Sequence, residues 1–263
     1  MSTLHSVESR DGTVIGFETL GQGSPLLLVH GTTADRTRWT PVLDALTARF
    51  TVHVVDRRGR GLSTAEQGPY ALRREGEDIA AVAETIGQDV YLVGHSYGAL
   101  CSLEAALLTS SITRMFLYEP PTDGRSIVST EARDKVRKVA AAGNAEATLE
   151  ALFREALGTP PPAVQAMKAS PTWLARLATA PTVMRELDGV ETFDILDRLG
   201  QITVPVRLLL GTESPPYFRS AAETIAAHLP NADLATLHGQ AHLGVDGDPA
   251  QFTAAVFAFI DQL

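Results

Sequence analysis

Gly94-His95-Ser96-Tyr97-Gly98 is the most informative stretch of this sequence, and it matches the pattern G-x-S-x-G. A short apolar run, Asp89 to Val93, precedes it, and an almost wholly apolar stretch continues to Leu108. These flanks predict a strand, a tight turn and a helix, in that order. The glycines permit a strained turn that leaves the serine hydroxyl exposed above the edge of a sheet. The context therefore favours a nucleophilic serine over a capping serine in a glycine-rich turn.

The sequence on both sides of this motif alternates between strands and helices. The continuous apolar run from Pro25 to His30 is typical of a parallel strand that is covered on both faces. The other elements expected near it are a strand over Thr13 to Leu20, a helix from Pro41 to about Phe50, a strand over Thr51 to Asp56, a helix that ends at Gly87 and a strand over Ile112 to Tyr118. This order indicates a parallel α/β sheet built from βαβ units.

The alternation stops after about Pro120 and resumes near residue 202. The intervening segment shows only helical periods, which prolines interrupt. A strand over Val204 to Gly211, a helix, a short strand over Asp233 to Leu237 and a final helix follow it. We therefore expect residues 1–120 and 202–263 to form one α/β core, and residues 121–201 to form an inserted helical cap.

Composition and charge narrow the class of partner. A chain of 263 residues with 44% hydrophobic residues can bury one sizeable core, and its net charge of −9 disfavours nucleic acid or an anionic membrane surface. Cys101 is the only cysteine, which excludes an internal disulfide and a thiolate zinc cluster. Neither a signal peptide nor an apolar run long enough to span a membrane is readable. We expect a cytoplasmic protein that acts on a small molecule.

A serine hydroxyl is a poor nucleophile by itself, so this interpretation requires a histidine base later in the chain. His242, in Gly239-Gln240-Ala241-His242, follows the last predicted strand and should return to the same edge of the sheet. His238 is the competitor, although it would lie at the end of the strand itself. A metal site formed by both histidines is disfavoured because no nearby carboxylates complete it. The remaining candidates lie in strand or helix patterns and are interpreted as structural: His5, His53 and His228.

Attack on a carbonyl creates a negative oxygen that backbone amides must stabilise. The amide of Tyr97, at the start of the predicted helix, is one candidate donor. The loop after His30-Gly31 should supply the second, and Thr32 is suitably placed there.

Four motifs in this order and spacing resemble the α/β-hydrolase family, and the resemblance covers nearly the whole chain. They are Leu28-Val29-His30-Gly31-Thr32, Asp56-Arg57-Arg58-Gly59-Arg60-Gly61-Leu62-Ser63, Gly94-His95-Ser96-Tyr97-Gly98 and Gly239-Gln240-Ala241-His242. The resemblance implies an eight-stranded, mostly parallel sheet flanked by helices with a cap, and a Ser-acid-His triad. It makes Ser96 the nucleophile, His242 the base, and the amides of Thr32 and Tyr97 the oxyanion hole. We interpret Arg57 to Gly61 as a structural turn.

The triad acid departs from the commonest family pattern. That pattern places an aspartate three residues after the glycine that closes the strand over Val204 to Gly211, and Ser214 stands there instead. Glu213 is a carboxylate one residue early. Glu119 comes directly after a strand that should neighbour the one leading to Ser96, and Pro120-Pro121 would hold that strand exit rigid. We favour Glu119 and keep Glu213 as the alternative.

Family members similar to the zearalenone-type lactone hydrolases also place a glutamate acid after the strand that corresponds to Ile112 to Tyr118. The same relatives carry a tryptophan in the cap, in a setting similar to Pro171-Thr172-Trp173-Leu174. Trp173 is therefore a candidate roof for the substrate pocket, and packing between cap helices is the alternative. Trp39 either lines the same space or packs beneath it.

These residues predict a cofactor-independent serine hydrolase without a metal site. It would cleave a carboxylic ester or lactone of a small, fairly apolar molecule through an acyl-enzyme. Carbon–carbon bond hydrolysis and cofactor-free, haloperoxidase-like peroxidation are alternatives on the same fold. A non-catalytic ligand-binding protein is the alternative from another class.

Overall fold

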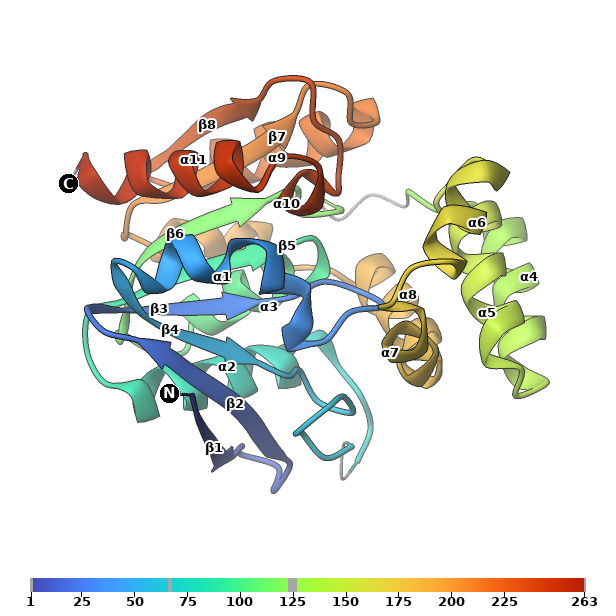
Figure 1. The fold of residues 1–263 in the computed structure, drawn as a ribbon, viewed down its shortest axis with the longest axis horizontal. Helices are drawn as coiled ribbons and strands as arrows, with labels where there is room; N and C mark the ends of the chain where they lie inside the picture. Colours follow the sequence, from blue (N-terminus) through green and yellow to red (C-terminus); the bar gives the residue numbers. More distant parts are fainter. Residues whose placement is uncertain (1, 66–67, 123–126, 263) are drawn as a thin grey trace.

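The computed structural model describes residues 2–65, 68–122 and 127–262. Within them one sheet has the strand order β1-β2-β4-β3-β5-β6-β7-β8. The pairs β1–β2 and β2–β4 are antiparallel, and all the later neighbours are parallel. The predicted eight-stranded, mostly parallel sheet is confirmed, and Figure 1 shows helices on both of its faces.

The strands are short. They are β1 (Thr3–Glu8), β2 (Val14–Gly21), β3 (Ser24–Val29), β4 (Phe50–Val55), β5 (Val90–His95), β6 (Ile112–Tyr118), β7 (Val206–Gly211) and β8 (Ala232–Leu237). The helices that flank the sheet are α1 (Thr40–Thr47), α2 (Leu72–Ile86), α3 (Tyr97–Ala106), α9 (Pro216–His228), α10 (Gly244–Gly247) and α11 (Pro249–Asp261), with a 3-10 turn, η1 (Arg36–Trp39), before α1.

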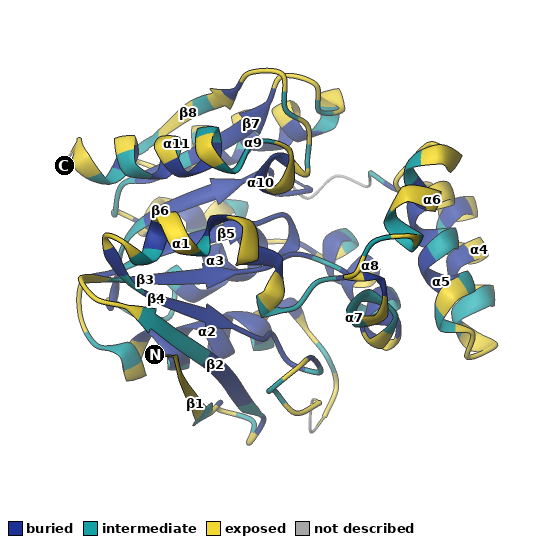
Figure 2. Cartoon of the chain, in the orientation of Figure 1, coloured by how far each residue is buried: buried dark blue, intermediate teal, exposed yellow. Residues whose placement is uncertain are grey.

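Alternate residues of each central strand build two separate cores. In β3, Leu27 and Val29 belong to the apolar cluster formed with α2, α3 and α9, whereas Leu26 and Leu28 belong to the cluster formed with α1 and α11. Successive side chains of a strand point to opposite faces, so an unbroken apolar run is required here. Figure 2 shows the central strands buried between helices whose outer sides are exposed.

In the described part of the segment between β6 and β7, all the regular elements are helices. They are α4 (Thr130–Ala141), α5 (Ala145–Ala151), η2 (Leu152–Ala156), α6 (Pro161–Lys168), α7 (Trp173–Ala178), η3 (Ala180–Thr182), α8 (Val183–Glu191) and η4 (Leu196–Gln201). Figure 1 shows α4 to α8 grouped beyond one end of the sheet, toward which the arrows of β3 and β6 point. This inserted segment, residues 121–201, has an apolar cluster of its own around Val136, Leu149 and Val183. Its last part does not follow the expected division, because Val190 and Phe193 pack in the cluster of the sheet.

Two features of the N-terminal half differ from what the residue pattern predicts. Residues 3–8 form an edge strand, although most of them are exposed and the pattern gives no strand there. Backbone pairing with β2, from Thr3–Thr19 to Glu8–Val14, holds β1 in place, and polar edge strands carry little hydrophobic signal. Helix α1 ends at Thr47 rather than near Phe50, because Phe50 begins β4 and packs in the core.

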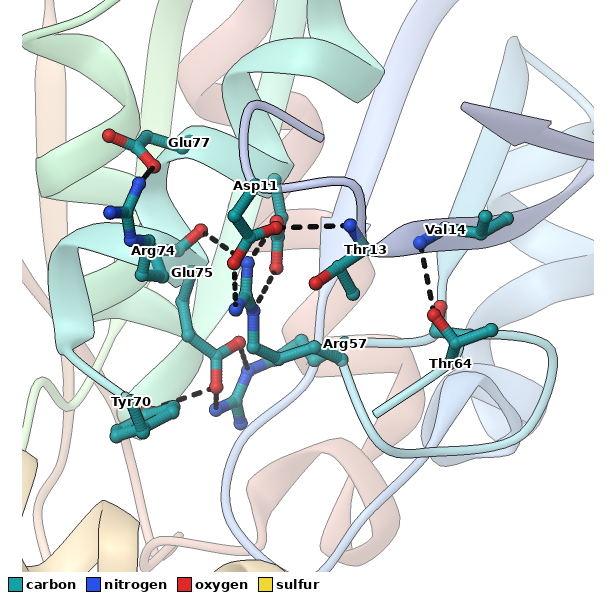
Figure 3. Close-up of polar contacts among 12 residues, drawn as sticks. Asp11, Thr13, Val14, Arg57, Thr64, Tyr70, Arg74, Glu75 and Glu77 are labelled. Carbon is teal, nitrogen blue, oxygen red and sulfur yellow. Dashed lines mark hydrogen bonds and ion pairs between the residues drawn. The ribbon is translucent and has the colours of Figure 1, made fainter. Parts of the chain in front are cut away.

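The turn from Arg57 to Gly61 anchors a buried network of charges. The Nε and Nη2 atoms of Arg57 donate to both carboxylate oxygens of Glu75, at 2.9 and 2.7 Å, and Tyr70 also donates to Glu75 (Figure 3). Arg57 Nη2 also donates at 2.8 Å to Glu186 of α8, which Arg60 contacts as well. Burial alone would raise the pKa of Glu186, but the charges of Arg57 and Arg60 outweigh burial and lower it to about 2. The network therefore joins the sheet to the inserted segment.

The structure predicts a pH effect on stability through His53 in β4. Burial, with a smaller effect from His5, lowers the pKa of His53 from 6.5 to about 4. Between those two pH values the unfolded chain binds a proton that the folded chain does not, so the free energy of unfolding rises with pH over this window. Urea unfolding at pH 7 and pH 5 should show that His53→Leu reduces the loss at pH 5 by on the order of 1 kcal/mol, allowing for partial solvent access to the ring. An equal loss in both proteins would contradict this assignment.

None of the helices in the described part of the chain is both long and apolar enough to cross a bilayer.

Candidate active site

Ser96 occupies a strained turn between β5 and α3. Its backbone angles are φ 56° and ψ −125°, in the left-handed half of conformational space that residues with a side chain rarely adopt. A Cβ atom on Gly98 would lie 2.4 Å from the carbonyl oxygen of Val29, and one on Gly31 would lie 2.8 Å from Cβ of Ser96. Glycine is therefore required at both positions for the close approach of the loop after β3 to the serine.

Glu119 and His242 are joined by a direct hydrogen bond. Nδ1 of His242 lies 2.7 Å from Oε2 of Glu119, and the amide of Gly211 donates to Oε1 of the same carboxylate at 2.8 Å. Glu119 follows β6, has φ 50° and is fully buried. Because its second oxygen is held by a backbone donor from β7, the carboxylate has a fixed orientation toward the ring. The bond at Nδ1 leaves Nε2 of His242 for another partner.

The imidazole of His242 packs against the rings of Phe218 and His95. Phe218 stacks on it with centroids 4.4 Å apart and an interplanar angle of 15°, and His95 lies 4.7 Å away. The Nε2 atom of His95 lies 2.9 Å from the carbonyl oxygen of His242 and donates to it, while Tyr118 donates to the carbonyl oxygen of Ala241. Burial and the nearby His242 and Arg38 keep the pKa of His95 well below its usual range, so His95 is neutral. These contacts fix the loop that carries His242.

The competing residues lie elsewhere. Glu213 is exposed, and its carboxylate accepts a hydrogen bond from Thr212 at 3.3 Å. His238 is also exposed. The structure thus brings the favoured acid, and not the alternative, to His242.

The two predicted oxyanion donors lie beside the serine. Tyr97 is the first residue of α3, and the amide of a first helical residue has no acceptor within its helix. Thr32 follows Gly31 in the loop after β3 and lines the same cavity as Ser96. Arg57 Nη1 donates to the carbonyl oxygen of Gly31 at 3.2 Å, so the buried charge network also supports this loop.

Ser96 and His242 line one small cavity of about 70 Å³ between the sheet and the inserted segment. Apolar side chains form much of its wall: Leu152, Phe153, Leu157, Met167 and Leu243. A second cavity of about 640 Å³ lies next to it, since both are lined by Thr33, Ala34, Arg38, Met167, Arg176 and Leu243. The larger space extends along α6, α7 and the start of α1.

The two tryptophans pack in apolar clusters. Trp173 is buried with Val164 and Val183 in the cluster of the inserted segment, and it is absent from the described lining of both cavities. This placement favours the packing alternative over a roof for the pocket. Trp39 lies beneath the site, where its ring is 6.2 Å from Phe252 and 6.5 Å from His95.

The residue pattern did not single out several side chains that shape this site. Phe218, which stacks on His242, follows Pro215-Pro216 at the start of α9, and an aromatic residue there gave the only hint. Arg38 and Arg176 come from elements far apart in sequence, so no spacing rule connects them.

The fold and the arrangement at Ser96 are those of a known class, and the chain belongs to the alpha/beta hydrolase family. The model of that family matches residues 26–256, and the resemblance inferred from the motifs is confirmed. The chain is accordingly a hydrolase of this family.

Individual relatives support the same class. The crystal structure of an alpha/beta hydrolase from Sphaerobacter thermophilus is similar over 97% of this chain and 100% of that one, with a TM-score of 0.86 and 33% identity. The 2-(acetamidomethylene)succinate hydrolase of Mesorhizobium japonicum is 25% identical over 92% of this chain and 89% of the relative. The pimeloyl-[acyl-carrier protein] methyl ester esterase of Aliivibrio salmonicida is 24% identical, over 94% and 96% respectively.

Proposed function

We propose that this protein is a serine hydrolase that cleaves a carboxylic ester or lactone of a small molecule through an acyl-enzyme. One observation carries the proposal. Nδ1 of His242 is hydrogen-bonded at 2.7 Å to the buried carboxylate of Glu119, and the ring of His242 lines the same cavity as Ser96. Ser96 is the nucleophile, His242 the base and Glu119 the acid of the triad.

In the acylation step, Nε2 of His242 takes the proton of the Ser96 hydroxyl as its oxygen attacks the carbonyl carbon. Glu119 accepts from Nδ1–H, which holds the ring in the tautomer whose Nε2 can accept a proton, and stabilises the imidazolium that forms. The amides of Tyr97 and Thr32 donate to the oxyanion. The protonated His242 then gives its proton to the leaving alcohol, and the acyl group stays on Ser96.

In the second half of the cycle, His242 activates a water molecule that attacks the acyl-enzyme. The carboxylic acid leaves and Ser96 regains its proton. For a lactone, the alcohol and the acyl group remain on one molecule, so the same steps open a ring.

The apolar wall of the cavity at Ser96 suits the carbon chain near the scissile bond. One relative is named as a methyl ester esterase and another as a hydrolase of an acetamidomethylene compound, so the named relatives differ in their substrates. We propose the ester or lactone because an alkoxide leaves a tetrahedral intermediate more readily than an amine does.

A fluorophosphonate probe tests the proposal directly. Intact mass should show one adduct on the wild type, peptide mapping should place it on Ser96, and Ser96→Ala should remain unlabelled. In parallel, 4-nitrophenyl butyrate and a panel of lactones should show turnover that the probe inhibits with the same time course as labelling. An adduct on another residue, or no adduct and no turnover, would show that the assigned triad is wrong.

A further inference from the structure

We infer that the molecule hydrolysed at Ser96 carries a carboxylate group, and that Arg38 and Arg176 bind this carboxylate where the two cavities meet. The inference rests on the proposed hydrolase function and adds the class of substrate. It is drawn from hydrogen-bond donors that are buried and have no acceptor among the described residues.

The two arginines face the same space from opposite sides of the site. Arg38 belongs to η1, in the loop between β3 and α1, and Arg176 belongs to α7 of the inserted segment. Both line the cavity of about 70 Å³ that contains Ser96 and His242, and both line the neighbouring cavity of about 640 Å³. A substrate whose acyl carbon is at Ser96 and whose remaining atoms extend into the larger cavity therefore passes beside both guanidinium groups.

Arg38 has one free edge. Its side chain is only 5% exposed, and its Nη1 atom donates to Asp246 at 2.5 Å. The Nε and Nη2 atoms are buried and have no hydrogen-bond partner among the residues that the structure describes. These two atoms form the edge of a guanidinium that binds a carboxylate through two parallel hydrogen bonds.

Two other arginines of this chain show which group the Nε and Nη2 edge binds. Nε and Nη2 of Arg57 bind the two oxygens of Glu75, and Nε and Nη2 of Arg58 bind those of Asp78, both at 2.7 Å. In Arg57 and Arg58 this edge is filled by a carboxylate of the protein. In Arg38 the protein supplies none within the described residues, and the side chain lines a cavity instead.

Arg176 adds a second cation to the site. Its Nη1 atom donates to the carbonyl and hydroxyl oxygens of Thr33 at 3.2 and 3.0 Å, and its buried Nε has no partner in the described part of the chain. Burial, followed by the charge of Arg38, lowers the pKa of Arg176 from its ordinary value. The two guanidinium groups therefore repel each other, and an anion placed between them would relieve that repulsion.

Two protein carboxylates lie near this pair but do not fill the site. Asp246 bonds to the other side of Arg38, and its side chain is 48% exposed, so solvent screens its charge. Asp35 accepts hydrogen bonds from the amide and hydroxyl of Thr37 at the start of η1. Neither reaches the free Nε and Nη2 edge of Arg38.

A carboxylate fits these donors better than a neutral group does. A buried donor without an acceptor is unfavourable, and a hydroxyl or a single carbonyl oxygen would leave at least one of the three free donor nitrogens unpaired. A carboxylate has two oxygens for the free edge of Arg38 and lone pairs that remain for Arg176. We therefore expect the substrate to be a half-ester of a dicarboxylic acid, or a lactone that bears an acid group.

Two matched esters test the inference. Mono-4-nitrophenyl glutarate carries a carboxylate at the end of its acyl chain, whereas 4-nitrophenyl pentanoate has a chain of similar length and no charge. Wild type should hydrolyse the anionic ester with a kcat/KM at least about tenfold higher, mainly through a lower KM. Arg38→Met should remove most of this preference, and Arg38→Lys should restore only part of it because one ammonium cannot pair with both oxygens.

Arg176→Met should lower the same ratio, which keeps the test valid if Arg38→Met folds poorly. Arg73→Met is the matched control, because Arg73 is an exposed arginine of α2 that pairs with Glu77. It should leave the ratio unchanged. Equal rates for the two esters in wild type, or an equal loss on both in the Arg38 and Arg176 variants, would overturn the inference while leaving the serine mechanism intact.

A binding measurement separates this inference from the proposed reaction. In Ser96→Ala, sodium glutarate should raise the melting temperature above that in sodium chloride of equal ionic strength, and the added Arg38→Met should abolish the rise. The same shift with and without Arg38, or no shift in Ser96→Ala, would contradict a carboxylate site. Failure of the proposed function itself would appear as the absence of a Ser96 adduct and of turnover of either ester.

Discussion

Glu119→Gln is expected to lower kcat/KM for an ester by about 10⁴-fold with little loss of structure. Oε1 of Glu119 accepts from the amide of Gly211, and Oε2 accepts from Nδ1 of His242. A glutamine must place its NH₂ group at one of these positions. Facing Gly211, the NH₂ group would meet the N–H of Gly211, so that two donors oppose each other. Facing His242, it would force the ring proton onto Nε2, which then could not take the proton of Ser96.

Glu213→Gln is the matched control, because it makes the same chemical change on the exposed carboxylate that was the alternative acid. It should change kcat/KM by less than about threefold. Initial rates with 4-nitrophenyl butyrate, circular dichroism and the rate of fluorophosphonate labelling would be measured on both variants. A folded Glu119→Gln enzyme with near-normal rates, or a Glu213→Gln enzyme that is equally impaired, would refute Glu119 as the acid.

Arg57→Met should reduce the free energy of unfolding by about 3–5 kcal/mol. Arg57 is fully buried, binds both oxygens of Glu75 and contacts Glu186, and each of these carboxylates is itself buried. Methionine matches much of its volume, so the loss comes from leaving negative charge in the core without its principal partner. Activity should fall as well, since Arg57 also donates to the carbonyl of Gly31 beside Ser96.

Urea unfolding followed by fluorescence would measure the effect, with Arg73→Met as an exposed arginine that should cost less than about 0.5 kcal/mol. Adding Glu75→Gln to Arg57→Met should recover part of the loss, because it removes one of the unpaired charges. A loss below about 1 kcal/mol in Arg57→Met would show that water or relaxation compensates the two carboxylates.

Much of the fold could be predicted from local pattern. The apolar run of β3, the flanks of Ser96 and the strands around Tyr118 and Gly211 are buried on all sides, so each is visible in the sequence as a nearly continuous apolar run. Strand β1 could not be predicted in this way, because its residues are mostly exposed and only its hydrogen bonds to β2 define it.

The parts of the site that could be predicted are those that follow from the order of strands and motifs along the chain. Strand ends place Ser96, Glu119 and His242 at one edge of the sheet, but two strand-end carboxylates were available, and only the tertiary contact distinguishes Glu119 from Glu213. Trp173 shows the opposite case, because an aromatic residue in a helical segment suits a pocket wall or a core equally well. Arg38 and Arg176 line the same cavity because of how the inserted segment lies over the sheet, and no local sequence pattern predicts that arrangement.

Glu186 gives the inserted segment a further significance for protein engineering. Its carboxylate lies on α8, yet it neutralises Arg57 and Arg60, which belong to the turn after β4. A chain from which residues 121–201 had been excised would deprive both arginines of this counter-ion. Exchanging this segment for that of a relative, in order to alter substrate choice, should therefore yield a stable hybrid only when the donor segment brings an acidic residue to the position of Glu186.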